Sequence, residues 1–247
     1  MPGIFFQSIS RRNFLKFSSS AAAALVVSNT FGGVDEDAEL DLRLALLSDL
    51  HFPADPKNEF RKFFPVENLK TILPQVLAAK PAGVIINGDL ARLTGEVADY
   101  SALKSTLSDL ATKAPVFMAM GNHDNREHFY QSFEHSDGER QKLQDRHVLI
   151  IEQKPVRIIV LDSLFAASKT GGLLGKAQRD WLANYLKAAG DKPIVIFVHH
   201  TLGDGDNELL DAEYLLEMTV AAKQVKAIFY GHSHAYSFKK REDLHLI

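Results

Sequence analysis

The sequence predicts a single α/β domain in which strands and helices alternate along the chain. Three observations predict it: short apolar runs recur, amphipathic helical segments separate them, and several runs end in a cluster of polar side chains. The length of 247 residues and the hydrophobic content of 46% are sufficient for a full core. Neither a repeat nor an interdomain linker interrupts the pattern.

The elements follow one another in a regular order. The apolar runs expected to form strands are 42–47, 83–87, 116–120, 194–198 and 225–230. Two further runs, 148–151 and 156–161, lie close enough together to form a hairpin. The segments with helical spacing of apolar residues are 66–79, 100–110, 178–188 and 209–222. We therefore expect the domain to span residues 40–247.

Residues 1–33 have the organisation of a signal peptide. Arg11 and Arg12 precede a short apolar stretch, 17–27, and small residues follow it. The segment 10–16, Ser-Arg-Arg-Asn-Phe-Leu-Lys, resembles the bacterial twin-arginine signal. That resemblance implies a periplasmic or extracellular protein and makes the twin-arginine export machinery a partner. The apolar stretch is too short for a stable membrane span.

Composition excludes several classes of protein. The chain has no cysteine, which excludes a disulfide scaffold, a zinc ribbon and thiol catalysis. Its net charge is −3, or −6 without the first 34 residues, and it has no cluster of Lys and Arg. Nucleic acid is therefore not an expected partner, and a nuclease is disfavoured. The feature that needs an explanation is the presence of ten histidines.

Polar side chains follow five of the predicted strands at the point where each strand ends. Because the carboxyl ends of parallel strands lie along one edge of a sheet, we expect these clusters to converge there. Carboxylate, imidazole and amide groups without thiolates are ligands that suit Mn, Fe or Zn. The clusters are Asp49 with His51; Asp89; Asn122 with His123 and Asp124; His199 with His200; and His232 with His234.

The series Asp-x-His, Gly-Asp, Gly-Asn-His-Asp, His and Gly-His-x-His, from about residue 42 to His234, resembles the calcineurin-like metallophosphoesterase superfamily. Within it, the spacing resembles the class III cyclic-nucleotide phosphodiesterase branch. The resemblance implies a two-sheet β-sandwich flanked by helices. It also implies two metal ions, a small phosphate-ester substrate and attack of a metal-bound hydroxide on phosphorus. A phosphodiesterase is the expected activity, and a phosphomonoesterase or a non-catalytic scaffold with the same fold are the alternatives.

The resemblance also implies a role for each residue of the clusters. His123 would protonate the leaving alkoxide or, alternatively, support Asn122, and Asp124 would orient the His123 imidazole. His200 would face the substrate or support the ligands. The first metal ion would be held by Asp49, His51, Asp89 and His234, and the second by Asp89, Asn122, His199 and His232, with Asp89 bridging the two.

Three features lie outside this pattern. Arg92 stands three residues after Asp89, where purple acid phosphatases keep a tyrosine, which argues against that branch. A group of phenylalanines, Phe60, Phe63 and Phe64, can either stack on a base or pack in the core. The apolar end 244–247 is typical of an interrupted strand, so one expectation is a domain that is incomplete at its C-terminus.

Overall fold

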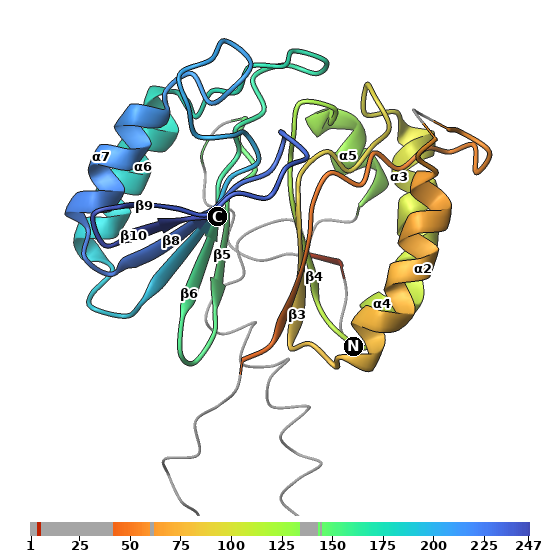
Figure 1. Cartoon of the computed structure of the whole chain (residues 1–247), viewed down its shortest axis with the longest axis horizontal. Helices are drawn as coiled ribbons and strands as arrows, with labels where there is room; N and C mark the ends of the chain where they lie inside the picture. Colours follow the sequence, from red (N-terminus) through yellow and green to blue (C-terminus); the bar gives the residue numbers. More distant parts are fainter. Residues whose placement is uncertain (1–3, 6–41, 60–61, 134–142, 144) are drawn as a thin grey trace, which may run out of the picture.

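The computed structural model describes residues 4–5, 42–59, 62–133, 143 and 145–247. Apart from residues 4–5, the predicted signal peptide lies outside the described residues, as does Phe60. Two sheets face each other, and helices cover the outer face of each (Figure 1). The expected two-sheet sandwich flanked by helices is therefore confirmed.

The first sheet is parallel, with the strand order β1-β4-β3-β2. Its strands are β1 (Ile4–Phe5), β2 (Leu44–Leu47), β3 (Gly83–Asn87) and β4 (Val116–Ala119). The helices on its side of the molecule are α2 (Pro65–Ala78), α3 (Val97–Thr106), α4 (Ser108–Ala111) and α5 (Arg126–Ser132).

The second sheet is mixed, with the strand order β5-β6-β7-β8-β10-β9. It contains the predicted hairpin, in which β5 and β6 pair antiparallel, and then a parallel core. Its strands are β5 (Leu149–Glu152), β6 (Arg157–Val160), β7 (Ile194–Phe197), β8 (Val225–Phe229), β9 (Lys239–Arg241) and β10 (Leu244–Leu246). The helices beside it are α6 (Gly175–Ala188) and α7 (Ala212–Ala221).

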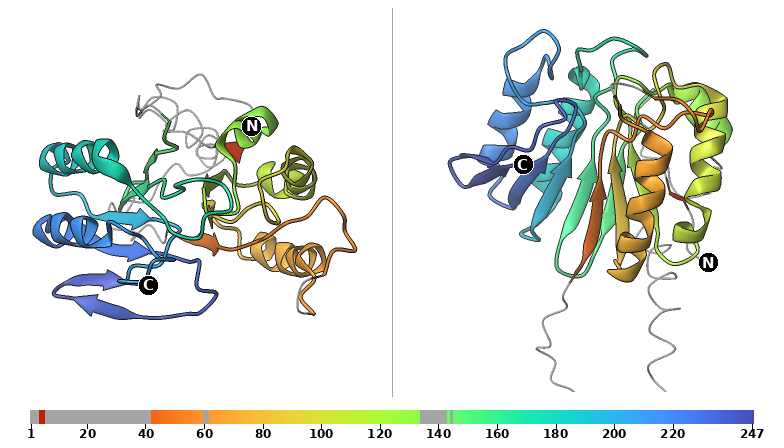
Figure 2. Two further views of the ribbon diagram at one scale, coloured as in Figure 1. Left: turned by 90° about the horizontal axis from the view of Figure 1, so that it is seen from above. Right: turned by 45° about the vertical axis from the view of Figure 1, so that its right-hand side comes forward.

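The buried apolar side chains form three layers, one between each sheet and its helices and one between the two sheets. In β3, Val84 and Ile86 belong to the cluster under the helices, whereas Ile85 points to the opposite sheet and packs with Phe117 and Phe197. Successive side chains of a strand face opposite sides, so a fully apolar strand can serve both layers. The view from above shows the strands between the two outer sets of helices (Figure 2).

The structure differs from the sequence-based expectation at several short helices and strands. The predicted helix 100–110 is divided into α3 and α4 at Leu107. The helix α5 has only seven residues, too few for a clear periodic signal, and is capped by Asn125, whose side chain accepts from the amide of His128. The apolar end 244–247 contributes β10, which lies between β8 and the charged strand β9. The pairing of β10 with β8 is parallel.

Candidate metal centre

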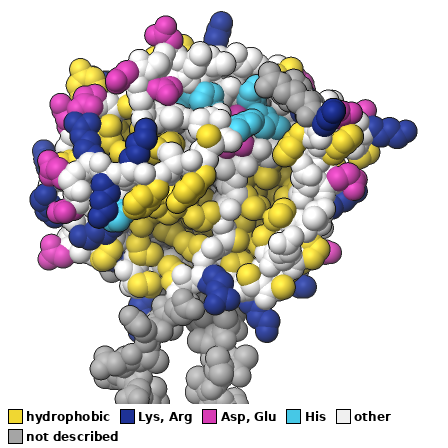
Figure 3. Space-filling model, viewed as in Figure 1, with side chains coloured by type: hydrophobic (Ala, Val, Ile, Leu, Met, Phe, Trp, Pro, Cys, Tyr) yellow, Lys and Arg dark blue, Asp and Glu magenta, His cyan; other side chains and the backbone are white. Residues whose placement is uncertain are grey.

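The five polar clusters do converge, at the carboxyl ends of β2, β3, β4, β7 and β8. The pairing of the strands continues into the loops that carry the clusters: the amide of His51 donates to the carbonyl of Asp89 at 2.9 Å, and the amide of Gly231 donates to that of His199 at 2.8 Å. A pocket of about 860 Å³ opens there. Histidines gather in this region on the face shown in Figure 3. The polar side chains that line the pocket floor are Asp49, His51, Asp89, Asn122, His123, His232 and His234.

Within the described part of the chain, three overlapping groups of side chains can each hold a metal ion. The ligand atoms of each group lie within 4.8 Å of one another. Since two of the groups share His51 and two share Asp89, they form one continuous centre rather than separate sites. The groups are Asp49, His51 and His234; His51, Asp89 and His123; and Asp89, His199 and His232.

Asp89 lies between the two halves of this centre. Its Oδ2 is 3.6 Å from His51 Nε2 and 3.4 Å from His199 Nε2. Burial opposes ionisation of the carboxyl, but the neighbouring His199 and His51 outweigh burial and lower the pKa of Asp89. Asp89 is therefore a buried carboxylate that can face a cation on either side.

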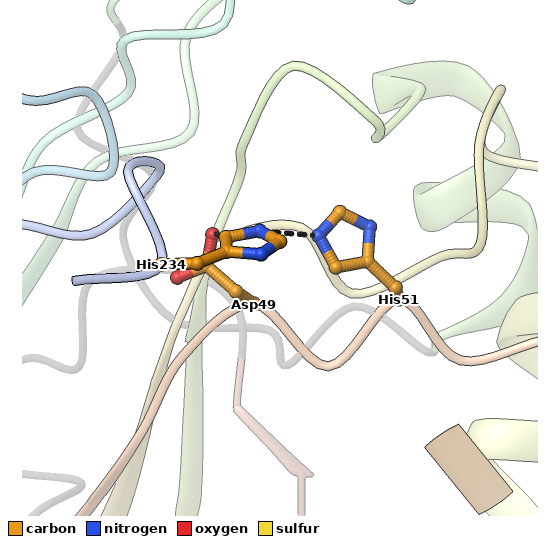
Figure 4. A group of neighbouring side chains, drawn as sticks. All are labelled: Asp49, His51 and His234. Carbon is orange, nitrogen blue, oxygen red and sulfur yellow. Dashed lines mark hydrogen bonds and ion pairs between the residues drawn. The ribbon is translucent and has the colours of Figure 1, made fainter. Parts of the chain in front are cut away.

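The group of Asp49, His51 and His234 is more exposed, because two of its side chains are half-buried and His234 is exposed. Figure 4 shows the rings of His51 and His234 facing each other beside Asp49. The Nε2 atoms of His51 and His234 face each other at 3.0 Å, and His234 Nε2 lies 3.5 Å from Asp49 Oδ1. Burial is the main cause that lowers the pKa of His51, which favours its neutral form. A neutral imidazole offers a lone pair, so two such atoms aimed at one another next to a carboxylate suit a shared cation.

The group of Asp89, His199 and His232 tests the fit more strictly because Asp89 and His199 are buried. His199 Nδ1 pairs with the carbonyl of Asn87 at 2.8 Å, which leaves Nε2 as the atom directed into the centre. Five buried side-chain atoms of the described residues have no hydrogen-bond partner, and two of them, His199 Nε2 and Asn122 Oδ1, belong to predicted metal ligands. His199 Nε2 has only its ion-pair contact with Asp89 Oδ2 at 3.4 Å. Such atoms are costly unless they are satisfied. Two of them beside a buried carboxylate fit a metal ion well.

The backbone is strained at the same positions. Positive φ angles occur at ten of the described non-glycine residues, and five of those are predicted ligands. Left-handed conformations cost of order 1–3 kcal/mol each and cluster at functional sites. The strain is thus concentrated where the loops turn their side chains into the centre. The five angles are 54° at Asp49, 44° at His51, 48° at Asp89, 71° at His232 and 53° at His234.

His123 lies beside the first group, with its ring 4.9 Å from that of His51. Its backbone amide donates to Asp89 Oδ1 at 2.9 Å. Its Nδ1 pairs with the carbonyl of Leu93 at 2.8 Å, so the ring orientation is set by the loop after β3. This arrangement directs Nε2 to the pocket and away from the carbonyl.

The structure places Asp124 away from the His123 imidazole that it was expected to orient. The fully buried Asp124 carboxylate accepts hydrogen bonds from the amides of Leu90, Ala91 and Gly121. The hydroxyl of Tyr100 donates to it as well, at 3.0 Å. Burial and the charge of Asp89 raise the pKa of Asp124 to about 6. Asp124 therefore joins the loops after β3 and β4, and the Leu93 carbonyl is the group that holds His123.

The structure also places His200 outside the pocket lining. Its side chain is fully buried, its Nδ1 pairs with Ser163 Oγ at 2.7 Å, and its ring lies 4.9 Å from that of His232. Burial lowers the pKa of His200, with the charge of His199 adding to the effect. This position matches the supporting role among the expected alternatives rather than contact with substrate.

Several residues of the pocket carry no signal in the sequence. Leu93 acts through its carbonyl, which residue type does not reveal. Tyr236, which also lines the pocket, is the exception. It stands two residues after His234, and in an extended segment residues two apart point to the same side, so this spacing could have indicated it. Phe63 and Phe64 are 50% and 41% exposed, so the core interpretation of these two residues is wrong, and Phe63 lines the pocket.

Gly121 is required by the close approach of Asp89. A Cβ atom at this position would lie 2.2 Å from Asp89 Oδ1 and 2.7 Å from His199 Cδ2. We expect Gly121→Ala to lower the free energy of unfolding by roughly 1–3 kcal/mol in urea denaturation, because the packed centre must move. Gly205→Ala is the matched control, since its Cβ would make only ordinary contacts with Glu208, the closest at 3.4 Å. Equal stability of the two variants would contradict this reading of the packing.

Comparison with known proteins agrees with this geometry. Residues 42–236 match the family model of the calcineurin-like phosphoesterases. The chain is 31% identical over 201 residues to a probable glycerophosphodiester phosphodiesterase of Arcobacter nitrofigilis, covering 77% of this chain and 71% of that protein. It is 30% identical over 207 residues to a probable cyclic nucleotide phosphodiesterase of Rhodopseudomonas palustris, covering 78% and 72%. A dimetal phosphatase from Danio rerio shares the fold, with a TM-score of 0.67, 14% identity and coverage of 83% and 86%.

The N-terminal segment has its own match. Residues 8–28 fit the model of the twin-arginine translocation signal, which confirms the motif and indicates export across the cytoplasmic membrane. Within the described ranges, no helix combines the length and the apolar character needed to cross a bilayer.

Proposed function

The chain belongs to the calcineurin-like phosphoesterase family, and on that premise we propose that it hydrolyses phosphodiesters in the periplasm or outside the cell. The observation that carries the proposal is the convergence of two Asp/His groups joined by Asp89 on the floor of one pocket. The two bacterial relatives are described as a probable glycerophosphodiester phosphodiesterase and a probable cyclic nucleotide phosphodiesterase, which supports a diester as substrate rather than a monoester.

The donor set suits two Mn, Fe or Zn ions, because it consists of carboxylate, imidazole and amide groups without a thiolate. When bound, two such ions stabilise the negative charge of the phosphoryl group and lower the pKa of a coordinated water towards neutrality. The unpartnered atoms of Asn122 and His199 support this distribution of ligands. We assign Asp49, His51, Asp89 and His234 to one ion, and Asp89, Asn122, His199 and His232 to the other.

His123 is the proposed general acid. In the protonated imidazole, the hydrogen on Nδ1 stays with the carbonyl of Leu93, and the hydrogen on Nε2 is available to the leaving alkoxide. Arg92 also lines the pocket, where Asn58 holds its Nε at 2.7 Å. A guanidinium held in this way favours an anionic substrate over a neutral one.

A direct assay with the full chain tests the proposal. We expect hydrolysis of bis(p-nitrophenyl) phosphate that requires added Mn²⁺ and is lost with a chelator, and slower hydrolysis of p-nitrophenyl phosphate. Cleavage of the monoester alone would overturn the diester assignment and indicate a phosphomonoesterase. A folded, metal-loaded protein that cleaves neither compound would instead be a scaffold of this fold.

A further inference from the structure

The pocket has an apolar wall above its polar floor. Three large apolar side chains from separate segments line it: Phe63 before α2, Leu93 after β3 and Tyr236 after β8. They are 50%, 53% and 85% exposed. Large apolar side chains that are exposed together around one pocket are typical of a binding surface.

The wall is continuous with the reacting centre. The carbonyl of Leu93 pairs with Nδ1 of His123, so the segment that carries the Leu93 side chain also holds the proposed general acid. Tyr236 follows the floor residue His234 in the same loop. An ester substituent on a phosphate at the metal centre would therefore share one pocket with this wall.

Three hydroxyl groups elsewhere in the pocket lining have hydrogen-bond partners within the protein. Ser48 donates to the carboxylate of Asp49, Thr170 donates to Asn207 Oδ1 at 2.6 Å, and the Tyr230 hydroxyl pairs with Ser237 Oγ at 2.7 Å. The side chains of Phe63 and Leu93 offer no polar atom to a hydroxylated ester group, whereas an apolar group gains buried area against them.

We propose that this site selects phosphodiesters in which the ester that is not cleaved carries a flat apolar group the size of an aryl ring, and that Phe63 and Tyr236 bind that group. This inference rests on the proposed phosphodiesterase function. The aromatic faces offer offset or edge contacts to a flat group, in addition to the burial of apolar area. Neither residue belongs to the metal centre, so their effect is on substrate selection.

The experiment compares two substrates that release the same product. Bis(p-nitrophenyl) phosphate carries a second aryl ester, and methyl p-nitrophenyl phosphate carries a methyl group in its place. With the full chain and saturating Mn²⁺, we expect Phe63→Ala and Tyr236→Ala each to lower kcat/KM for the aryl diester roughly three- to tenfold, mainly through KM. For the methyl diester we expect a change of less than about twofold.

The controls are two exposed aromatic residues that do not line the pocket, Phe64 at 41% and Phe238 at 53% exposure. Phe64→Ala and Phe238→Ala should change neither substrate. Calorimetric titration with phenylphosphonate and methylphosphonate provides a readout without turnover, in which only the phenyl compound should bind more weakly to the Phe63 and Tyr236 variants.

The outcomes separate this inference from the proposed function. Equal losses on both substrates, or losses no larger than those of the control variants, would overturn the apolar subsite while leaving a phosphodiesterase in place. Absence of metal-dependent cleavage in the unaltered protein would overturn the function itself.

Discussion

Replacement of Asp89 by alanine is expected to abolish phosphodiester hydrolysis and to deplete the protein of metal. Asp89 belongs to two of the three ligand groups, and its Oδ2 lies within 3.6 Å of both His51 Nε2 and His199 Nε2. Loss of an outer-shell partner lowers metal affinity or activity by about 10–100-fold, so loss of a ligand shared by two ions should exceed roughly 100-fold. The measurement is kcat/KM for bis(p-nitrophenyl) phosphate at saturating Mn²⁺, together with metal content by mass spectrometry.

Two further variants make this result interpretable. Asp89→Asn keeps the shape of the side chain and an oxygen that can accept from the His123 amide, but removes the charge, so it should fold like the parent and still lose metal. Asp180→Ala removes a carboxylate on the exposed surface of α6 and should leave activity and metal unchanged. Retention of two ions per chain by Asp89→Ala would disprove the bridging assignment.

The position of each polar cluster at the end of a strand could be predicted from the sequence. Strands such as β3 and β7 are short apolar runs buried on both faces, and each is followed at once by a polar cluster. A parallel sheet brings the carboxyl ends of such strands to one edge, whatever the length of the connections. Asp49 follows β2 and His234 follows β8, which belong to different sheets, so their approach to 3.5 Å also depends on how the two sheets pack, and only the family resemblance implied that packing.

The supporting contacts could not be predicted, because they depend on backbone groups and on the paths of the loops. Asp124 follows His123 directly, yet its carboxylate points to three backbone amides. His200 follows His199, but Ser163 and the ring of His232 enclose it. Phe63 has the residue type of a core position and lies instead on the pocket wall. Residue type alone does not distinguish these environments.

Replacement of His123 by alanine is expected to slow hydrolysis in proportion to how poor the leaving group is. A p-nitrophenolate leaves without protonation, so its rate should change little, whereas an alkoxide needs the proton from Nε2 and should be slowed by about 10²–10⁴-fold. The measurement is the dependence of log kcat/KM on the pKa of the leaving alcohol across a series of diesters, which should become steeper in the variant. Metal content is measured in parallel.

His128→Ala is the matched control, since His128 pairs through Nδ1 with the carbonyl of Gly95 at 2.7 Å, much as His123 pairs with Leu93, but does not line the pocket. It should leave the leaving-group dependence unchanged. If His123→Ala instead loses metal, the group formed by His51, Asp89 and His123 is a true ligand set, and His123 is a ligand. If good and poor leaving groups are slowed equally with metal retained, His123 binds the phosphoryl group without transferring a proton. The slope and the metal content together therefore distinguish the three roles that a histidine at this position can have.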